Sequence, residues 1–303
     1  MSGFTVGDID ALELERTSPL AEMYTLSPFA WREDAKYGLL VRAVNRSEVA
    51  AEKIARVYYG HAGDGLRFTM GDHPVIRPGP GEDDKDGCED PTLAIVGGRY
   101  YVYYTGWNQS LKHGQLLLAA GPDVEHLEKR GIALPWKPQC ENPKEATIVS
   151  VADGTWRLFF EHAVAGASKI GIASAPAVDG PWTVLHSFLE TRPKRWDSWH
   201  MSTGPVLTTD PQRPVMFYNG ATSQAHWRIG WVMFDENYTR IVARCEEPMI
   251  TPPTSRSTGD TDIAFAASSI EEHDAIYLYY SVADKDMFRA TVRRTTSGET
   301  GAS

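Results

Sequence analysis

Five short apolar runs with the same texture recur along the chain. Each run combines branched or aromatic side chains with few polar residues, and the runs read LLVRA at 39–43, YVYYT at 101–105, RLFFE at 157–161, VMFYN at 215–219 and YLYYS at 277–281. They are spaced by about 60 residues, which is near the longer blade repeats of β-propellers and too long for most helical solenoids. The spacing therefore predicts one β unit repeated five times.

Each apolar run has strand-like neighbours on both sides. An extended segment and a turn precede it, as in 91–96 followed by Gly97-Gly98, and a further strand-like segment follows it, as in 115–119 or 228–232. The last run has little chain after Val292, so we expect the N-terminal segment to complete the fifth unit. The pattern predicts an all-β, five-bladed β-propeller whose four-stranded antiparallel blades surround a central channel.

The repeat also sets the domain organisation. We expect residues 1–292 to form a single propeller domain, and the Ser-, Thr- and Gly-rich segment 293–303 to be a disordered tail. A pair of β-sandwiches with accidentally similar spacing is the alternative to one propeller.

Composition narrows the class of protein. The 303 residues include 9 Trp, 13 Tyr, 26 Gly and 19 Pro, which suits a turn-rich β protein. The formal net charge of −10 argues against a nucleic-acid partner. No apolar run approaches the roughly 18 residues of a membrane span, and the N-terminal residues lack the features of a secretory signal. We therefore expect a cytoplasmic protein with neither a nucleic-acid nor a membrane partner.

The sequence shows no pattern for a metal or a nucleotide cofactor. Cys88, Cys140 and Cys245 have unpatterned spacings that predict neither a disulfide framework nor a zinc cluster. P-loop, metalloprotease and nucleophile-elbow motifs do not occur in the sequence. We expect no metal and no cofactor.

The first strand of each predicted blade lines the channel, so polar residues just before these strands meet in space. Asp90 is the candidate general acid there. Asp-Pro is also a common turn starter, but the repeat places Asp90 beside Glu89 and near the acidic residues at 82–86. Crowded negative charge and burial raise a carboxyl pKa, and a raised pKa keeps a general acid protonated near neutral pH. The sequence therefore predicts that the pKa of Asp90 is raised.

The third predicted blade supplies two more carboxyl groups. Glu145 follows Lys144, and Glu161 precedes His162 at the end of the next strand. Each pair has an ordinary structural interpretation, as a surface ion pair or a packed histidine. Lys144 and His162 lie on neighbouring strands, however, where both side chains could reach the same anion.

Other residues are candidates for holding a substrate. An arginine inside an apolar run, Arg42, needs a partner or a ligand. Tryptophans in or beside loops are either surface packing residues or flat platforms for the apolar face of a sugar ring. The candidate binding set is Arg42, Trp107, Lys144, His162, Trp199, His200 and Asp262, with Trp196 and Trp227 as further aromatic positions.

Five segments taken in order resemble glycoside hydrolase family 130, the β-mannoside phosphorylases and hydrolases, over nearly the whole chain. They are 39–43 (LLVRA), 89–91 (EDP) with 100–105, 195–198 (RWDS) leading to Gly204-Pro205, 241–253, and 262–265 with 279–284 (YYSVAD). The resemblance implies a five-bladed propeller that cleaves a β-mannoside with inversion, either with water or with inorganic phosphate as co-substrate to give a sugar 1-phosphate. An oligosaccharide or small glycoside would be its substrate.

The resemblance also assigns roles. It makes Asp90 the proton donor, Arg42 and Asp262 sugar-holding residues, and Lys144 and His162 phosphate-binding groups. The chain departs from the family pattern at Thr92, where the family has arginine, and at Ser27, where it has asparagine. If water is the nucleophile, a base carboxylate is needed, for which Glu145 is the first candidate and Glu161 the second.

Two other functions stay open from the sequence. The related family 43 arabinosidases and xylosidases share the propeller, and Asp90 and Glu145 match two of their three acids, but Ser27 occupies the position of the base. A non-catalytic sugar-binding propeller is the second alternative. The pattern leaves the leaving-group sugar, the linkage and the oligomeric state open.

Overall fold

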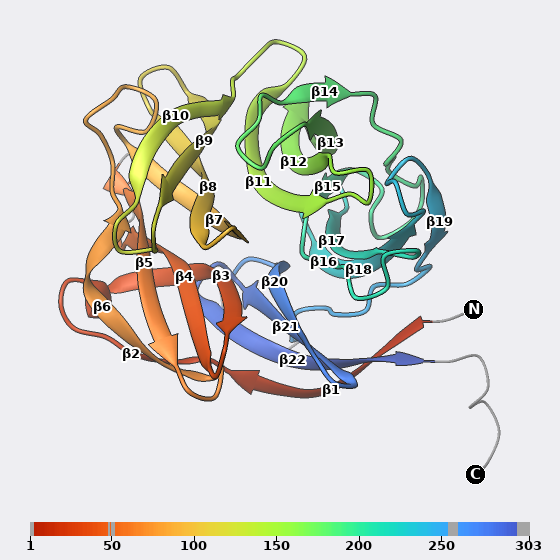
Figure 1. Cartoon of the computed structure of the whole chain (residues 1–303), viewed down its shortest axis with the longest axis horizontal. Helices are drawn as coiled ribbons and strands as arrows, with labels where there is room; N and C mark the ends of the chain where they lie inside the picture. The colour runs from red at the N-terminus through yellow and green to blue at the C-terminus, as the bar shows by residue number, and fades with distance from the viewer. Residues whose placement is uncertain (1–2, 48, 50–51, 254–259, 296–303) are drawn as a thin grey trace.

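Five small antiparallel sheets are arranged around a central channel in the computed structural model, which describes residues 3–47, 49, 52–253 and 260–295 (Figure 1). From the channel outward, blade 1 contains β3 (Met23–Glu33), β4 (Lys36–Asn45), β5 (Ala55–Ala62) and β6 (Arg67–Ile76). Blade 2 contains, in the same order, β7 (Gly87–Val96), β8 (Arg99–Asn108), β9 (His113–Gly121) and β10 (Glu128–Leu134). Blade 3 contains β11 (Glu141–Ser150), β12 (Trp156–Val164), β13 (Ala167–Ala175) and β14 (Thr183–Leu185). The five-bladed fold predicted from the repeat is confirmed.

The inner strand of blade 4 is interrupted. Blade 4 contains β15 (His200–Ser202) and β16 (Val206–Leu207), both paired with β17 (Val215–Ala221), then β18 (Trp227–Phe234) and β19 (Ile241–Arg244). The short β2 (Glu13–Glu15) extends the sheet of blade 1 as a parallel strand beside β6, and a 3-10 turn, η1, spans Leu20–Glu22. The described residues contain no helix long and apolar enough to cross a membrane.

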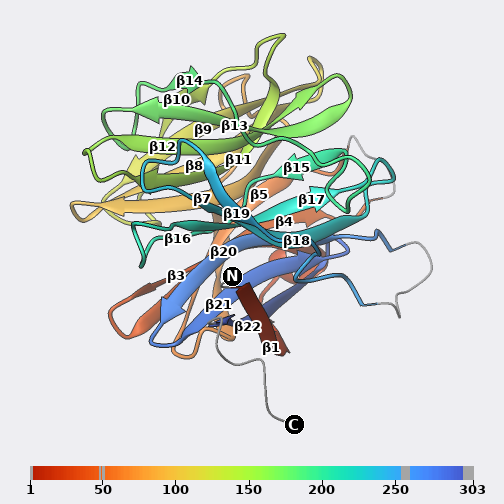
Figure 2. The same ribbon diagram turned by 90° about the vertical axis from the view of Figure 1, so that its right-hand side faces the viewer.

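Blade 5 closes the ring with both ends of the chain. It consists of β20 (Ala264–Glu272), β21 (Ala275–Val282), β22 (Asp286–Thr295) and, as its outermost strand, β1 (Gly3–Ala11). The antiparallel pairing of β1 with β22 runs from Gly3 opposite Thr295 to Ala11 opposite Phe288 (Figures 1 and 2). The predicted closure by the N-terminal segment is confirmed. Because β1 provides a partner strand, β22 continues through residues 293–295 of the predicted tail, and 296–303 lie outside the described residues.

The hydrophobic core lies between the blades. The five apolar runs of the sequence are the second strands β4, β8, β12, β17 and β21, and their side chains pack in five separate clusters. Each cluster joins two neighbouring blades, as where Tyr103 of blade 2 packs with Phe160 of blade 3. Burying such a side chain contributes about 1.5–3 kcal/mol, so the contacts between blades hold the ring together.

Polar side chains connect the blades closer to the axis. Thr92 Oγ1 donates to the carbonyl of Ala146 at 2.6 Å, and Thr147 Oγ1 donates to the carbonyl of Gly204 at 3.0 Å. Ser268 Oγ donates to the carbonyl of Pro28 at 2.8 Å, which connects blade 5 to blade 1. Thr92, where the family pattern has arginine, therefore has a structural partner in blade 3.

Asn219 makes the corresponding connection between blades 4 and 5. Its Nδ2 donates to the carbonyls of Thr203 and Ala266, at 2.6 and 3.1 Å, and its Oδ1 accepts from the backbone N–H of Ala266 at 2.7 Å. The side chain is fully buried. Because the side chain is buried, the backbone groups of Thr203 and Ala266 would be left without these hydrogen-bond partners if Asn219 were lost.

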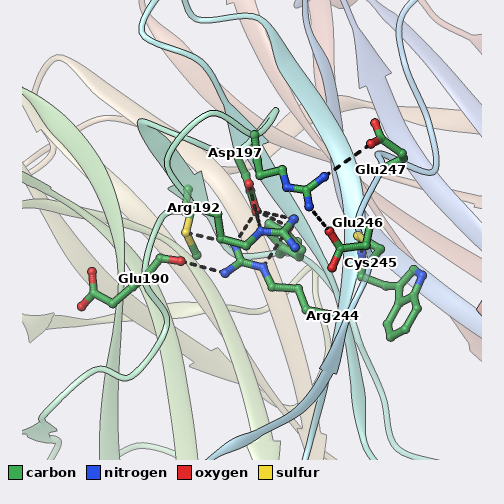
Figure 3. A network of polar contacts seen from close by, with 11 residues as sticks. Glu190, Arg192, Asp197, Arg244, Cys245, Glu246 and Glu247 are labelled. Atoms are coloured by element: carbon green, nitrogen blue, oxygen red, sulfur yellow. Dashed lines mark hydrogen bonds and ion pairs between the residues drawn. The ribbon is translucent and has the colours of Figure 1, made fainter. Parts of the chain in front are cut away.

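The long connection between blades 3 and 4 is fixed by a buried ion-pair network (Figure 3). The Asp197 carboxylate contacts Arg192 at 2.9 Å and Arg244 at 2.6 Å, and it accepts a 2.6 Å hydrogen bond from Tyr218. The ring of Trp196 stacks on Tyr218 with 5.2 Å between centroids. The RWDS segment of the sequence is thus a structural anchor that fixes the chain just before β15.

We predict that Asn219→Ala lowers the free energy of unfolding by roughly 3 kcal/mol, because the buried N–H and carbonyl groups lose their partner at a cost of about 1–3 kcal/mol each. Urea denaturation measures this change. Gln109→Ala, which removes an exposed amide, is the control and should change stability by less than about 0.5 kcal/mol. An equally small effect of Asn219→Ala would show that this seam bond does not stabilise the ring.

Candidate active site

A cavity of about 340 Å³ opens at one end of the channel. One part of its wall is charged and comes mainly from blades 1 to 3, with Arg42, Asp90, Lys144, Glu145 and Glu161. The other part is mainly apolar and is formed by Tyr24, Leu26, Val44, Trp227, Ile263 and Phe265. The first and second strands of blades 1 to 3 therefore bring the three candidate acidic residues Asp90, Glu145 and Glu161 to one cavity.

Backbone irregularities at equivalent places in three blades direct side chains into this cavity. The register of β3, β7 and β11 shifts between Leu26 and Phe29, between Glu89 and Thr92, and between Lys144 and Thr147. Ser27, Asp90 and Glu145 lie in these shifts with φ values of 52°, 48° and 52°. Positive φ is costly for residues other than glycine and is concentrated at functional sites. Bulges of this kind reorient a side chain out of the regular alternation.

Asp90 is buried and surrounded by donors. Its Oδ1 accepts from Ser27 Oγ at 2.7 Å, and Arg42 Nη1 lies 3.2 and 3.3 Å from its two carboxylate oxygens. Arg42 Nη2 also pairs with Glu89 at 2.8 Å. Ser27, which departs from the family pattern, thus holds the proposed acid.

The predicted direction of the Asp90 pKa shift is wrong. Burial by itself would raise the pKa of Asp90, but Arg42 and Lys144, together with the hydrogen bond from Ser27, hold it below its ordinary value. The acidic residues expected to crowd it have other partners: Asp84, for example, pairs with Lys129 at 2.5 Å and accepts from Tyr104 at 2.9 Å. Arg42 and Lys144 lie on other strands than Asp90, so the residues next to Asp90 in the sequence did not indicate these two cations.

Glu145 shows the opposite behaviour. Burial, and then the neighbouring charge of Asp90, raise the pKa of Glu145 well above its ordinary value. Asp90 and Glu145 line the same cavity, so the charge of one carboxyl group bears on the pKa of the other.

Lys144 and Glu161 form the next layer of the charged wall. Their Nζ and Oε1 atoms are 3.4 Å apart, and the Glu161 side chain is buried. The pKa of Lys144 is raised, chiefly by Glu161 and despite burial, so its ammonium group stays charged. Arg42, Lys144 and Glu161 are therefore part of one site, as the sequence predicted.

Five other predicted residues do not line the cavity. Asp262 pairs with Arg228 at 2.9 Å, Trp107 Nε1 donates to Gln109 at 3.0 Å, and Trp199 Nε1 donates to Gly166 at 3.4 Å. His200 Nδ1 accepts from the backbone N–H of Ser168 at 3.0 Å, and the half-buried His162 has its pKa lowered by burial. Their roles in substrate binding stay predictions.

Trp227, one of the further aromatic positions named from the sequence, lines the cavity, and so does Asp284, which the predicted set lacked. Trp227 packs edge-on against Phe265, with 5.3 Å between ring centroids, and lies 5.6 Å from the ring of His200. Asp284 follows β21 with a φ of 56° and reaches the cavity from blade 5. The sequence could have indicated Asp284, because this residue ends the YYSVAD segment and follows the buried strand β21.

Fold and site together define a propeller enzyme that cleaves glycosides, and comparison with known proteins gives the family. The model of glycoside hydrolase family 130, described as beta-1,4-mannooligosaccharide phosphorylase, matches residues 37–294. The chain belongs to this family. The resemblance read from the sequence motifs is confirmed, in preference to family 43 or a non-catalytic propeller.

Individual relatives agree with this assignment. The chain is 26% identical over 238 residues, 76% of each protein, to a 1,2-beta-oligomannan phosphorylase of Thermoanaerobacter sp. (strain X514). The beta-1,2-mannobiose phosphorylase of Listeria innocua, solved with beta-1,2-mannobiose, has the same fold with a TM-score of 0.76, 19% identity, and 94% and 90% of the two chains covered.

A further solved structure was reported with the finding that this family of mannoside phosphorylases contains glycoside hydrolases that target beta-1,2 mannosidic linkages in Candida mannan. Its fold matches with a TM-score of 0.74, 23% identity, and 93% and 86% of the two chains covered. The family therefore includes both phosphorylases and hydrolases.

We predict that Arg42→Met lowers the free energy of unfolding by roughly 3 kcal/mol at pH 8, because it leaves Asp90 and Glu89 without their cation. Without Arg42, the folded-state pKa values of both carboxyl groups rise, so the loss should be smaller at pH 5, where the groups can take up protons. Urea denaturation at the two pH values measures this. Arg67→Met, which breaks the exposed pair with Glu13, is the control and should cost at most about 1 kcal/mol at either pH. A loss independent of pH would contradict the charge argument.

Proposed function

We propose that this protein is an inverting glycoside hydrolase acting on β-mannosides, with β-1,2-linked manno-oligosaccharides as the preferred class. The observation that carries the choice of water over phosphate is the charge arrangement in the cavity. Arg42 is bound to Asp90 and Glu89, and Lys144 is bound to Glu161. A phosphate dianion needs cations free to pair with it. Because Arg42 and Lys144 already pair with carboxylates, Lys53 is the remaining cation among the described lining residues. The β-1,2 preference rests on the names of the relatives.

Asp90 is the proton donor in this proposal. Asp90 lines the cavity with Ser27 and Arg42 fixing both of its oxygens, which suits a group that must meet the glycosidic oxygen in one orientation. The apolar wall with Trp227 and Phe265 gives the sugar a surface for its C–H face.

Glu161 is the base that activates water. Inversion needs the acid and the base about 6.5–9.5 Å apart, so that a water molecule fits between the base and the sugar. The charge of Asp90 raises the pKa of Glu145, which places Glu145 as a near neighbour of the acid with little room for a water molecule. Glu161 lies on the next strand, β12, oriented by Lys144. It therefore replaces Glu145 as the first candidate for the base.

Phosphorolysis is the second candidate function. It is favoured by the names of the relatives and by two lysines in the cavity, Lys53 and Lys144. Phosphate would then attack the anomeric carbon in place of water, and Asp90 would keep its role.

We predict that β-1,2-mannobiose is cleaved at the same rate with and without inorganic phosphate. The α-anomer of mannose should appear first in proton NMR spectra, because a single displacement by water inverts a β-linkage. Dependence of the rate on phosphate, with formation of α-mannose 1-phosphate, would instead identify phosphorolysis.

We predict that Asp90→Asn and Glu161→Gln each lower kcat on β-1,2-mannobiose by about 10²–10⁴-fold, the usual contribution of a general acid or base. A dinitrophenyl β-mannoside, whose leaving group needs no proton, should restore turnover for Asp90→Asn only. Glu141→Gln, an exposed position on the same strand as Glu145, is the control and should match the wild type. Wild-type activity of Glu161→Gln would remove Glu161 as the base.

A further inference from the structure

A second cavity, of about 520 Å³, lies at the other end of β3 from the active site. The strand lines both cavities: Tyr24 and Ser27 line the active site, and Trp31 and Glu33 line the second cavity. A strand rises about 3.3 Å per residue, so Glu33 is roughly 20 Å along β3 from Ser27. Whatever binds in the second cavity is therefore a separate molecule or a distant part of a long chain.

Aromatic rings form one side of the second cavity. Trp31 and Tyr59 are stacked, with 5.8 Å between ring centroids and 24° between ring planes. Both rings, together with Tyr100, pack against the hydrophobic cluster between blades 1 and 2 and stay half-buried. Gly38 is paired with Trp31 across β3 and β4, and a Cβ atom at Gly38 would collide with the indole ring. The seam between the blades thus holds these rings in place at the cavity surface.

Carboxylates surround the rings. Glu33 and Asp34 are exposed at the turn between β3 and β4, and Asp123 and Glu125 belong to the loop between β9 and β10. Glu33 accepts a 2.5 Å hydrogen bond from the Tyr100 hydroxyl group, and Asp123 accepts from the backbone N–H of Glu125 at 2.9 Å. These bonds fix the hairpin on one side of the cavity and the loop on the other.

The chemistry of the lining selects the ligand. A carboxylate only accepts hydrogen bonds, so the ligand must donate them, and four carboxylates against Lys36 disfavour an anion. A sugar ring offers hydroxyl donors together with an apolar C–H face that matches an aromatic ring. An organic cation would also suit carboxylates and aromatic rings, but Lys36 repels it. Sugar hydroxyl groups, in contrast, accept from Lys36 and donate to the carboxylates.

We propose that this cavity is a second carbohydrate-binding site, which binds the same class of manno-oligosaccharide that the active site cleaves. The choice of mannose relies on the proposed function, and the site is compatible with attack by water or by phosphate. Because two sites on one protein can engage one polymer, the second site raises the apparent affinity for long β-mannans and leaves the chemistry on short ones unchanged.

Counting bound oligosaccharides tests the site directly. We expect native mass spectrometry with β-1,2-mannotetraose to show two oligosaccharides on the Asp90→Asn variant, which binds without cleaving, and one when Trp31→Ala is added. Trp31→Ala also removes packing from the seam, so the double variant Glu33→Ala/Asp34→Ala, at exposed positions, is a second probe and should weaken the second binding event by at least about tenfold. Glu236→Ala, an exposed carboxylate of blade 4, is the control and should leave two.

Kinetics separate binding at this site from a structural effect on the active site. Trp31→Ala and Glu33→Ala/Asp34→Ala should keep kcat and KM for β-1,2-mannobiose within about twofold of the wild type, whereas the apparent KM for a long β-1,2-mannan should rise at least about fivefold. Equal losses on both substrates would overturn the proposal.

The remaining outcomes distinguish the second site from the proposed function. One oligosaccharide on Asp90→Asn, or two that survive Trp31→Ala, would refute the second site while cleavage of mannobiose by the wild type still supports the function. Choline binding that Trp31→Ala abolishes, without a second oligosaccharide, would assign the cavity to an organic cation instead. A wild-type protein that cleaves no β-mannoside would refute the proposed function, whatever the count of bound sugars.

Discussion

The structure depends on how five inner strands stand next to one another around an axis without forming a continuous sheet. Neighbouring inner strands belong to different sheets, so the backbone groups that face the channel need partners of another kind. Thr92, Thr147, Asn219 and Ser268 supply these partners with hydroxyl and amide groups that reach across the seams. The same constraint explains the site, because the seam between blades 1 and 2 is crossed by the hydrogen bond from Ser27 to Asp90.

The active site is built from charges that neutralise one another. Arg42 pairs with two carboxylates and Lys144 pairs with Glu161, while burial and the charge of Asp90 raise the pKa of Glu145. Burial of so many charges near one point is tolerated only because each has a partner. Such an arrangement leaves little positive charge for an additional anion. This property follows from the convergence of blades 1 to 3.

Departures from the family pattern acquire a physical meaning in this arrangement. Thr92 replaces a long cation by a short hydroxyl group that connects blade 2 to blade 3. Ser27 replaces an amide by a hydroxyl group that donates to the acid. Both hydroxyl groups make a hydrogen bond across a seam between blades.

The sequence by itself determined the blade number, the closure by the N-terminal strand, the family and the convergence of Arg42, Asp90, Lys144, Glu145 and Glu161. It could do so because the apolar second strands repeat, and repetition fixes which residues occupy equivalent places. Only the tertiary structure decided that the pKa of Asp90 falls rather than rises, and that Asp262 pairs with Arg228. The physical reason is that a pKa and an ion pair depend on distances of a few ångströms between different strands, and spacing along the chain does not specify those distances.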